Sequence, residues 1–190
     1  MSHAVSPLAP DSFPELPPIA GVSLATFAAG LRYQKRADLM LALLDEGTTV
    51  AGTLTRSLCP SAPVDWCRSI LGGGKARAIV CNAGNANAFT GTAGQTAASH
   101  TATTIAGALG IPVDEVFLAS TGVIGETLEL TALDAGLASL VGELHNGPGA
   151  SWEDAARAIS TTDTYPKERA QRPRWAASMW RSVASPRGVA

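Results

Sequence analysis

The order of apolar and periodic segments is the feature that most restricts the fold. Strand-like runs come first, and short apolar runs then alternate with longer segments of helical character. We expect strands at 22–31, 39–44, 48–55, 76–81 and 116–119, and helices at 64–71, 92–109, 131–144 and 151–159. This order predicts a layered α/β or α+β domain.

One turn within this order has a specific signal. Asp45-Glu46-Gly47 interrupts the apolar runs 39–44 and 48–55. A short polar break that contains glycine is typical of a tight hairpin. We therefore expect these two strands to pair with each other.

The composition is that of one globular domain. The chain has 190 residues, of which 46% are hydrophobic and 16% charged, with a net charge of −2. It has no basic surplus, so we expect no nucleic-acid and no membrane partner. No run approaches the roughly 20 apolar residues of a transmembrane helix.

The cysteines Cys59, Cys67 and Cys81 form no Cys-x-x-Cys pair, so we expect no metal site, no disulfide framework and a cytoplasmic location.

An asparagine-rich segment follows the apolar run that ends at Cys81. It holds Asn82, Asn85 and Asn87, whose amides offer many donors and acceptors. Gly84 lies among them and permits unusual backbone dihedrals. Two interpretations stay open: the segment shapes a binding site, or it is a loop of Asx-turns in which the asparagines bind their own backbone.

Two further segments are rich in hydroxyl groups. Segment 119–125 carries Ser120, Thr121 and Gly122 after an apolar strand, so we expect a turn with backbone N–H groups aimed into a cleft. That geometry suits an oxyanion hole, a phosphate-binding nest or an ordinary turn. Segment 160–164 carries four hydroxyls and a carboxylate after a helix. It either binds the amino or amide group of a small substrate or is a solvated helix end.

Several common catalytic motifs are absent from the sequence. There is no Gly-x-Gly-x-x-Gly motif and no Gly-x-Ser-x-Gly motif, and the Gly-rich run 72–75 precedes a strand where a phosphate loop would precede a helix. His3, His100 and His145 are scattered along the chain. These observations give no support to a nucleotide-binding loop or to a Ser-His-Asp triad.

Taken together, the polar segments resemble the signatures of one enzyme family. Residues 79–87 with Thr90-Gly91 resemble the Asn-Ser-Gly-Asn-Ala-Asn-Ala-x-Thr-Gly signature of the ornithine acetyltransferase (glutamate N-acetyltransferase) family. Residues 119–126 resemble the second signature, and 161–167 resemble the third. The order and approximate spacing agree from about residue 13 to residue 167. The chain therefore resembles the N-terminal, α-chain portion of that family.

The resemblance implies a fold and a chemistry. The fold would be the α-chain half of the family's layered sandwich, which is similar to that of the N-terminal-nucleophile enzymes. Family members move an acetyl group from N-acetylornithine to glutamate in arginine biosynthesis, some also use acetyl-CoA as donor, and no cofactor is needed. Their precursor cuts itself before a threonine, which becomes the nucleophile of a separate β chain in an α2β2-like assembly. By position, Thr121 and Gly122 would form the oxyanion hole, Thr161 and Thr162 would contact substrate, and Ser120 and the three asparagines would shape the site.

The resemblance stops at residue 167. The family continues to an Ala-Lys-Gly-x-Gly-Met segment and then to the nucleophilic threonine, and residues 168–190 contain neither. We divide the chain into a flexible Pro-rich arm (1–18), an α-chain domain (19–167) and a divergent tail (168–190). Plausible GC-rich codons chosen for residues 175–190 and read one frame over give an Ala-Lys-Gly segment. A frameshift is therefore one hypothesis for the tail, and an authentic unusual tail is the other. We expect this chain alone to be inactive; the alternative function is an inactive remnant or a small-molecule-binding module.

Overall fold

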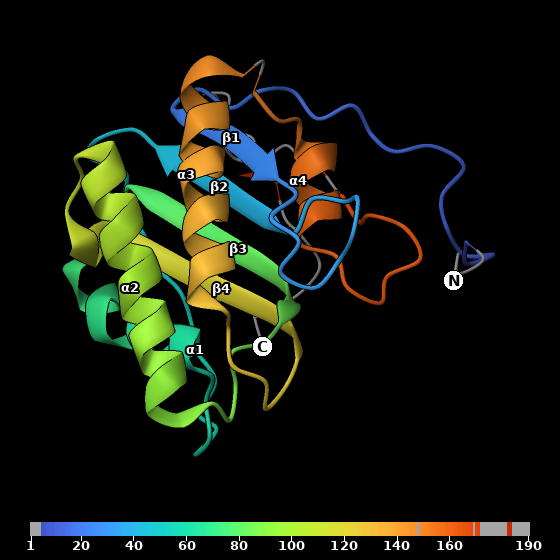
Figure 1. Ribbon diagram of the computed structural model, residues 1–190. Coiled ribbons are helices and arrows are strands. Elements are labelled where there is room, and N and C mark those ends of the chain that lie inside the picture. The colour runs from blue at the N-terminus through green and yellow to red at the C-terminus, as the bar shows by residue number, and fades with distance from the viewer. Residues whose placement is uncertain (1–4, 148, 169, 172–181, 184–190) are drawn as a thin grey trace.

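A four-stranded mixed sheet forms the centre of the molecule (Figure 1). The computed structural model describes residues 5–147, 149–168, 170–171 and 182–183. The strand order is β1 (Val22–Phe27), β2 (Leu39–Leu44), β3 (Ala78–Asn85) and β4 (Val116–Val123). β2 runs antiparallel to both β1 and β3, and β4 runs parallel to β3. The carboxyl ends of β1, β3 and β4 therefore meet at one end of the sheet, beside the start of β2.

Helices cover both faces of this sheet. The two long helices, α2 (Gly91–Leu109) and α3 (Leu130–Asn146), lie side by side on one face (Figure 1). The short helix α4 (Trp152–Ala158) packs on the opposite face at β1 and β2, and α1 (Ala62–Ile70) packs along β4. Two 3-10 turns, Leu71–Gly73 and Val113–Glu115, precede β3 and β4. The predicted layered α/β class is confirmed.

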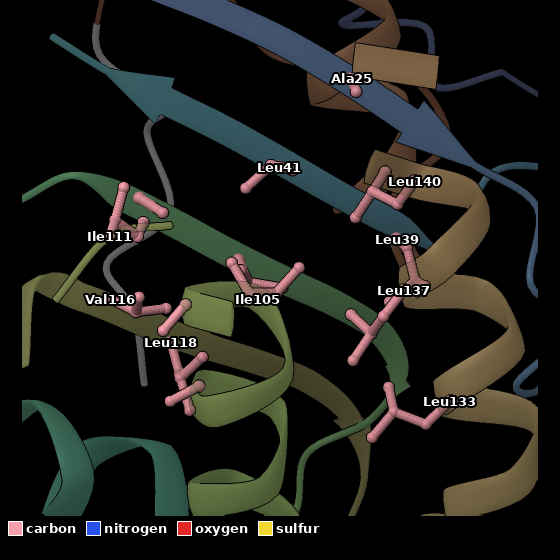
Figure 2. Packing of buried hydrophobic residues seen from close by; sticks show 14 of the residues in the cluster. Ala25, Leu39, Leu41, Ile105, Ile111, Val116, Leu118, Leu133, Leu137 and Leu140 are labelled. Atoms are coloured by element: carbon pink, nitrogen blue, oxygen red, sulfur yellow. The ribbon is translucent and has the colours of Figure 1, made fainter. Parts of the chain in front are cut away.

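The main core lies between the sheet and the two long helices (Figure 2). α3 contributes Leu133, Leu137 and Leu140, which are fully buried and share one helical face as their spacing predicts. Burial of each such side chain stabilises the fold by about 1.5–3 kcal/mol. Gly136 lies on the same face of α3, and a Cβ there would be 2.6 Å from the Cβ of Ala29. The absence of a side chain at this position is what lets α3 approach the sheet so closely.

The predicted hairpin between 39–44 and 48–55 is wrong. β2 coincides with the first of these runs, but its two edges are occupied by β1 and β3. No edge of β2 remains for residues 48–55, which contribute an isolated bridge between Thr49 and Lys75. The hydrophobic alternation in this segment therefore does not lead to a strand.

The two chain ends are described only in part. Residues 5–18 contain no helix or strand, and the backbone N–H of Ser6 donates to Thr164 Oγ1 at 3.1 Å. In the tail, β5 (Ala170–Gln171) pairs with β6 (Ser182–Val183), and most of 168–190 lies outside the described residues. The division into arm, domain and tail stays a prediction. None of the helices in the described part of the chain is long and apolar enough to cross a bilayer.

Candidate functional site

Two of the three polar segments lie next to each other at the carboxyl ends of β3 and β4. The prediction of a turn at Ser120–Gly122 is wrong, because β4 continues through these residues to Val123 and pairs with the end of β3. Asn82 lies opposite Ser120, and the Ser120 hydroxyl donates to Asn82 Oδ1 at 2.5 Å. The parallel pairing thus joins the asparagine segment to the hydroxyl segment.

The end of this strand pair is irregular. The register shifts between Gly84 and Asn85, and Gly122 has a φ of 136°. A Cβ at Gly122 would lie 2.2 Å from the carbonyl carbon of Gly84 and 2.5 Å from the backbone nitrogen of Asn85. The two backbones approach more closely here than any side chain permits, so residue 122 has to be glycine for both steric and conformational reasons.

The asparagine side chains are engaged within their own neighbourhood. Asn82 Nδ2 donates to the Asn85 carbonyl at 2.9 Å, and Asn85 Oδ1 accepts from the backbone N–H of Asn87 at 2.7 Å. Asn87 is 1% exposed and has a φ of 46°. Its amide donates to the Gly94 carbonyl at 2.9 Å and accepts from the Thr90 hydroxyl at 2.8 Å. The bond between Asn85 and Asn87 has the form of an Asx-turn, but Asn82 and Asn85 lie in β3 and Asn85 Nδ2 donates to the distant Glu126 carbonyl at 2.9 Å. The two interpretations of the segment therefore both stay open.

Little space remains inside this network. Asn82, Asn87 and Ser120 are among the residues that line a void of about 20 Å³. Such a void accommodates about one water molecule and is too small for a substrate. The asparagines are thus placed to fix the backbone at the ends of β3 and α2.

The outer edge of β4 is covered only along its first half. The Trp66 indole of α1 donates to the Val116 carbonyl at 2.9 Å, and Cys67 Sγ exchanges hydrogen bonds with the N–H and C=O of Leu118. Backbone groups alternate in direction along a strand, so those of Ser120 face the same outer edge as those of Leu118. Gly122 is exposed. The end of β4 at Gly122 is therefore open to solvent.

The connection between β1 and β2, residues 28–38, also lies at this end of the sheet. Asp38 is fully buried, and its two carboxylate oxygens accept from the N–H groups of Ala29 and Leu31, each at 2.7 Å. The Tyr33 ring lies against the end of β3, since a Cβ on Gly84 would be 3.2 Å from Tyr33 Cε2. Residues 28–31 were expected to continue the strand 22–31, but β1 ends at Phe27 and these residues belong to the connection. The signal that marks the connection in the sequence is a lone acidic residue before a wholly apolar run.

The third polar segment, residues 160–164, follows α4 and contacts the same connection. The Arg36 guanidinium donates from Nη2 to the Ser160 carbonyl, and its Cζ lies 3.9 Å from the centroid of the Tyr33 ring. Asp163 accepts from Lys167 Nζ at 2.5 Å. A chain of contacts from Gly84 through Tyr33 and Arg36 therefore links the asparagine segment to the residue that precedes Thr161.

An open cleft of about 380 Å³ lies beside this third segment. Its lining consists of polar and charged side chains with a few apolar ones: Thr26, Arg36, Ala37, Asp154, Arg157, Ser160, Asp163, Thr164, Tyr165 and Pro166. Thr162 is exposed and Thr161 is half-buried. The structure thus brings the three polar segments to one end of the sheet, with the connection 28–38 in contact with the first at Gly84 and with the third at Ser160.

The remaining reactive residue types lie outside this arrangement or are unreactive. Burial raises the pKa of the Cys81 thiol to about 12 and also raises the pKa of Cys67. His100 pairs with Asp134 at 2.6 Å between α2 and α3, in a contact exposed to solvent. Among the described residues, no group of three His, Cys, Asp or Glu is arranged to hold a metal ion.

The fold and the site define the protein as an ornithine-acetyltransferase-like domain. The chain is 36% identical to ornithine acetyltransferase of Mycobacterium tuberculosis, whose structure was determined in complex with ornithine; the TM-score is 0.80, and the match covers 89% of each chain. A second solved relative, the arginine biosynthesis bifunctional protein ArgJ of Bacillus halodurans, is 26% identical with a TM-score of 0.74, over 90% of this chain and 89% of that chain.

This chain belongs to the ArgJ family, whose model matches residues 23–188. It is 55% identical over 167 residues to the arginine biosynthesis bifunctional protein ArgJ of Bradyrhizobium diazoefficiens and 57% identical over 171 residues to that of Nitrobacter winogradskyi. Each match covers 88% of this chain but 40% of the relative. The chain therefore spans about two fifths of the length of these curated relatives, whereas the matched M. tuberculosis chain has about the length of this one, since both are covered equally.

Proposed function

We propose that this chain is the α-chain part of an acetyltransferase of arginine biosynthesis, which moves an acetyl group from N-acetylornithine to glutamate. The observation that carries the proposal is the exposed outer edge of β4 at Gly122, within a segment that the family signature associates with acyl transfer. The relatives are arginine-biosynthesis proteins, and one solved relative is an acetyltransferase that binds ornithine.

In this proposal, the backbone at Thr121 and Gly122 stabilises the oxyanion that forms on the acetyl carbonyl. Gly122 suits this role because the residue is exposed and its backbone is fixed by close contact with Gly84 and Asn85. Asn82, Asn85, Asn87 and Ser120 hold that backbone in place through their mutual hydrogen bonds. Thr161 and Thr162 contact the amino-acid substrate from the segment beside the cleft.

The nucleophile in this proposal is the N-terminal threonine of a β chain, which corresponds to the part of the relatives that this chain does not match. The threonine hydroxyl adds to the acetyl carbonyl carbon, the amide C–N bond of N-acetylornithine breaks, and the hydroxyl proton leaves on the ornithine amine. The glutamate amine then attacks the resulting ester, takes the acetyl group and returns a proton to the threonine oxygen. No step needs a metal or a cofactor.

The proposal also covers the assembly, a second acetyl donor and the cellular location of the enzyme. An α2β2-like assembly provides the β chain, and acetyl-CoA is a second acetyl donor to be tested. The three cysteines are free thiols, which suits the reducing cytoplasm, where we place the enzyme.

The test is complementation with the missing part. The 190-residue chain is produced with and without the remaining C-terminal portion of the B. diazoefficiens relative, and transfer from N-acetylornithine to glutamate is measured, with acetyl-CoA as a separate donor. We expect transfer only with both parts, and a loss in Thr161→Val. Thr103→Val is the matched control, because Thr103 lies exposed on α2 and its hydroxyl donates to the Ser99 carbonyl.

The alternative function, an inactive remnant or a small-molecule-binding module, predicts a different result. If the two parts form a stable complex without acetyl transfer, the acetyltransferase proposal is wrong for this chain. Binding of ornithine by the 190-residue chain alone, without transfer in the complex, would then favour the binding module.

A further inference from the structure

We propose that Arg36, stacked on Tyr33, is a positioning residue that fixes segment 160–164 against the carboxyl ends of the sheet strands and thereby sets the place of Thr161. The mechanical link rests on contacts within this chain. Its meaning for substrate binding rests on the proposed function, in which Thr161 contacts the amino-acid substrate.

The first step is the bond from Arg36 to the segment. Its guanidinium donates from Nη2 to the carbonyl of Ser160, the residue directly before Thr161. The planar cation lies over the Tyr33 ring at 3.9 Å, and its buried Nε has no hydrogen-bond partner among the described atoms. The guanidinium is partly desolvated, and the ring face and the one carbonyl restrict its orientation. Its bond to Ser160 therefore has a defined geometry.

The second step is the rigidity of the support. Tyr33 contacts the end of β3 at Gly84. In the connection that carries Tyr33 and Arg36, Asp38 accepts two short hydrogen bonds from the backbone of Ala29 and Leu31, which joins the two ends of the connection. Arg32, next to Tyr33, pairs at 2.7 Å with Glu126, which follows the end of β4. Arg36 is therefore attached to a braced connection rather than to a free loop.

The third step compares Arg36 with the other contacts of the segment. The Ser160 hydroxyl donates to the Ala156 carbonyl in α4, Asp163 pairs with Lys167, and Thr164 accepts from the arm. These contacts tie the segment to itself, to α4 and to the arm. The Arg36 contact ties it to the connection between β1 and β2, which also touches the end of β3. Without Arg36, the segment keeps its local shape and its attachment through α4 to β1 and β2, but it loses the direct bond from Ser160 to the connection.

The experiment uses two measurements, and a negative result in one of them leaves the other decisive. Hydrogen exchange of residues 158–166 in the 190-residue chain reports the mechanical link without any assumption about function. The KM for N-acetylornithine, measured separately from kcat in the complemented enzyme, reports the effect on substrate placement. The variants are Arg36→Gln, Arg36→Lys, Tyr33→Leu and Tyr33→Phe. Arg68→Gln is the matched control, because Arg68 also donates to a backbone carbonyl, that of Thr55 at 2.9 Å, but lies on α1.

We expect Arg36→Gln and Tyr33→Leu to speed exchange in 158–166 and to raise KM by about tenfold, with kcat changed less than about twofold, since a charge-assisted hydrogen bond contributes roughly this much. Tyr33→Phe, which keeps the ring face, retains wild-type values, and Arg36→Lys is intermediate. Unchanged exchange in Arg36→Gln overturns the mechanical link. Faster exchange with unchanged KM, or with a loss confined to kcat, overturns the positioning role. If the wild-type complex transfers no acetyl group, the proposed function fails, while the exchange result still decides the link.

Discussion

Replacement of Gly122 by alanine tests the close approach of β3 and β4 directly. The added Cβ would lie 2.2 Å from the Gly84 carbonyl carbon and 2.5 Å from the Asn85 nitrogen. Both atoms belong to the backbone of the neighbouring strand, so no side-chain rotation relieves the contact. Relief requires that the two strands move apart at the end where their register already shifts.

Two penalties contribute to the expected cost. Overpacking in a close-packed region costs about 1–3 kcal/mol. A non-glycine residue held at a φ of 136° adds about 1–3 kcal/mol of backbone strain. The two together predict a loss of about 2–6 kcal/mol in the free energy of unfolding, which is a large part of the roughly 5–15 kcal/mol of a typical domain.

Two other glycines separate these contributions. Gly110, at the end of α2, has a φ of 65° and open space around its Cβ position, so Gly110→Ala should cost about 1–2 kcal/mol from strain alone. Gly107, inside α2, has neither a positive φ nor a close neighbour, so Gly107→Ala should stabilise the fold by about 1 kcal/mol. Urea unfolding of the three variants gives the comparison. If Gly122→Ala costs no more than Gly110→Ala, the argument from close approach is refuted.

Three further predictions follow from single contacts. Asp38→Ala leaves two half-buried backbone N–H groups without an acceptor and should cost about 1–3 kcal/mol. Hydrogen exchange at 29–31 should become faster, and an unchanged exchange rate there would contradict the bracing role. At pH 8 a thiol reagent should modify Cys59, which is exposed, and leave Cys81 intact. The pKa of Cys81 is about 12, so roughly one Cys81 side chain in ten thousand is a thiolate at this pH. Mass spectrometry distinguishes the two sites. Hydrogen bonds from Ser151 lower the pKa of the Asp154 carboxyl. The contribution of Asp154 to stability is therefore present above the pKa of the unfolded state and is lost as the pH falls through the lower pKa of the folded state. Asp154→Ala should remove this part of the acid sensitivity in urea unfolding at pH 2–6.

The parts of the fold that the sequence predicted are those specified by local pattern. β2 matches the apolar run Leu39–Leu44, and α3 carries its buried leucines at the spacing of one helical face. α2 ends at Leu109 as expected, because Gly110 takes the left-handed conformation that terminates a helix. In each case the deciding interactions lie within a few residues of one another.

The failures have a common physical reason. β3 and β4 were expected to end at Cys81 and Ala119, but they continue through polar residues to Asn85 and Val123. Asparagine, serine and glycine favour loops locally, and only the partner strand supplies the hydrogen bonds that keep them extended, such as that from Ser120 to Asn82. The same holds for segment 48–55, whose pairing was decided by which edges of β2 were free.

The candidate site divides in the same way. Family signatures identified the three polar segments, since those residues are adjacent in sequence. Arg36 and Tyr33 were not identified, because their partners Ser160 and Gly84 lie 124 and about 50 residues away. The local sequence pattern of 28–38 does not distinguish a connection that positions its neighbours from an ordinary one. This part of the site can therefore be recognised only from the folded structure.

The geometry also bears on where the nucleophile of the proposed reaction must come from. Around Gly122, the Ser120 hydroxyl is committed to Asn82, and the asparagine amides are committed to backbone groups. Cys81 lies on the adjacent strand, but burial keeps its thiol protonated. In the proposed reaction the end of β4 supplies the donors for the oxyanion, and neither Ser120, nor the asparagines, nor Cys81 is available as the nucleophile. Such a half-site stabilises an oxyanion only when another polypeptide segment brings the attacking hydroxyl, so the acetyl-transfer proposal requires the complementing part to supply both the nucleophile and its base.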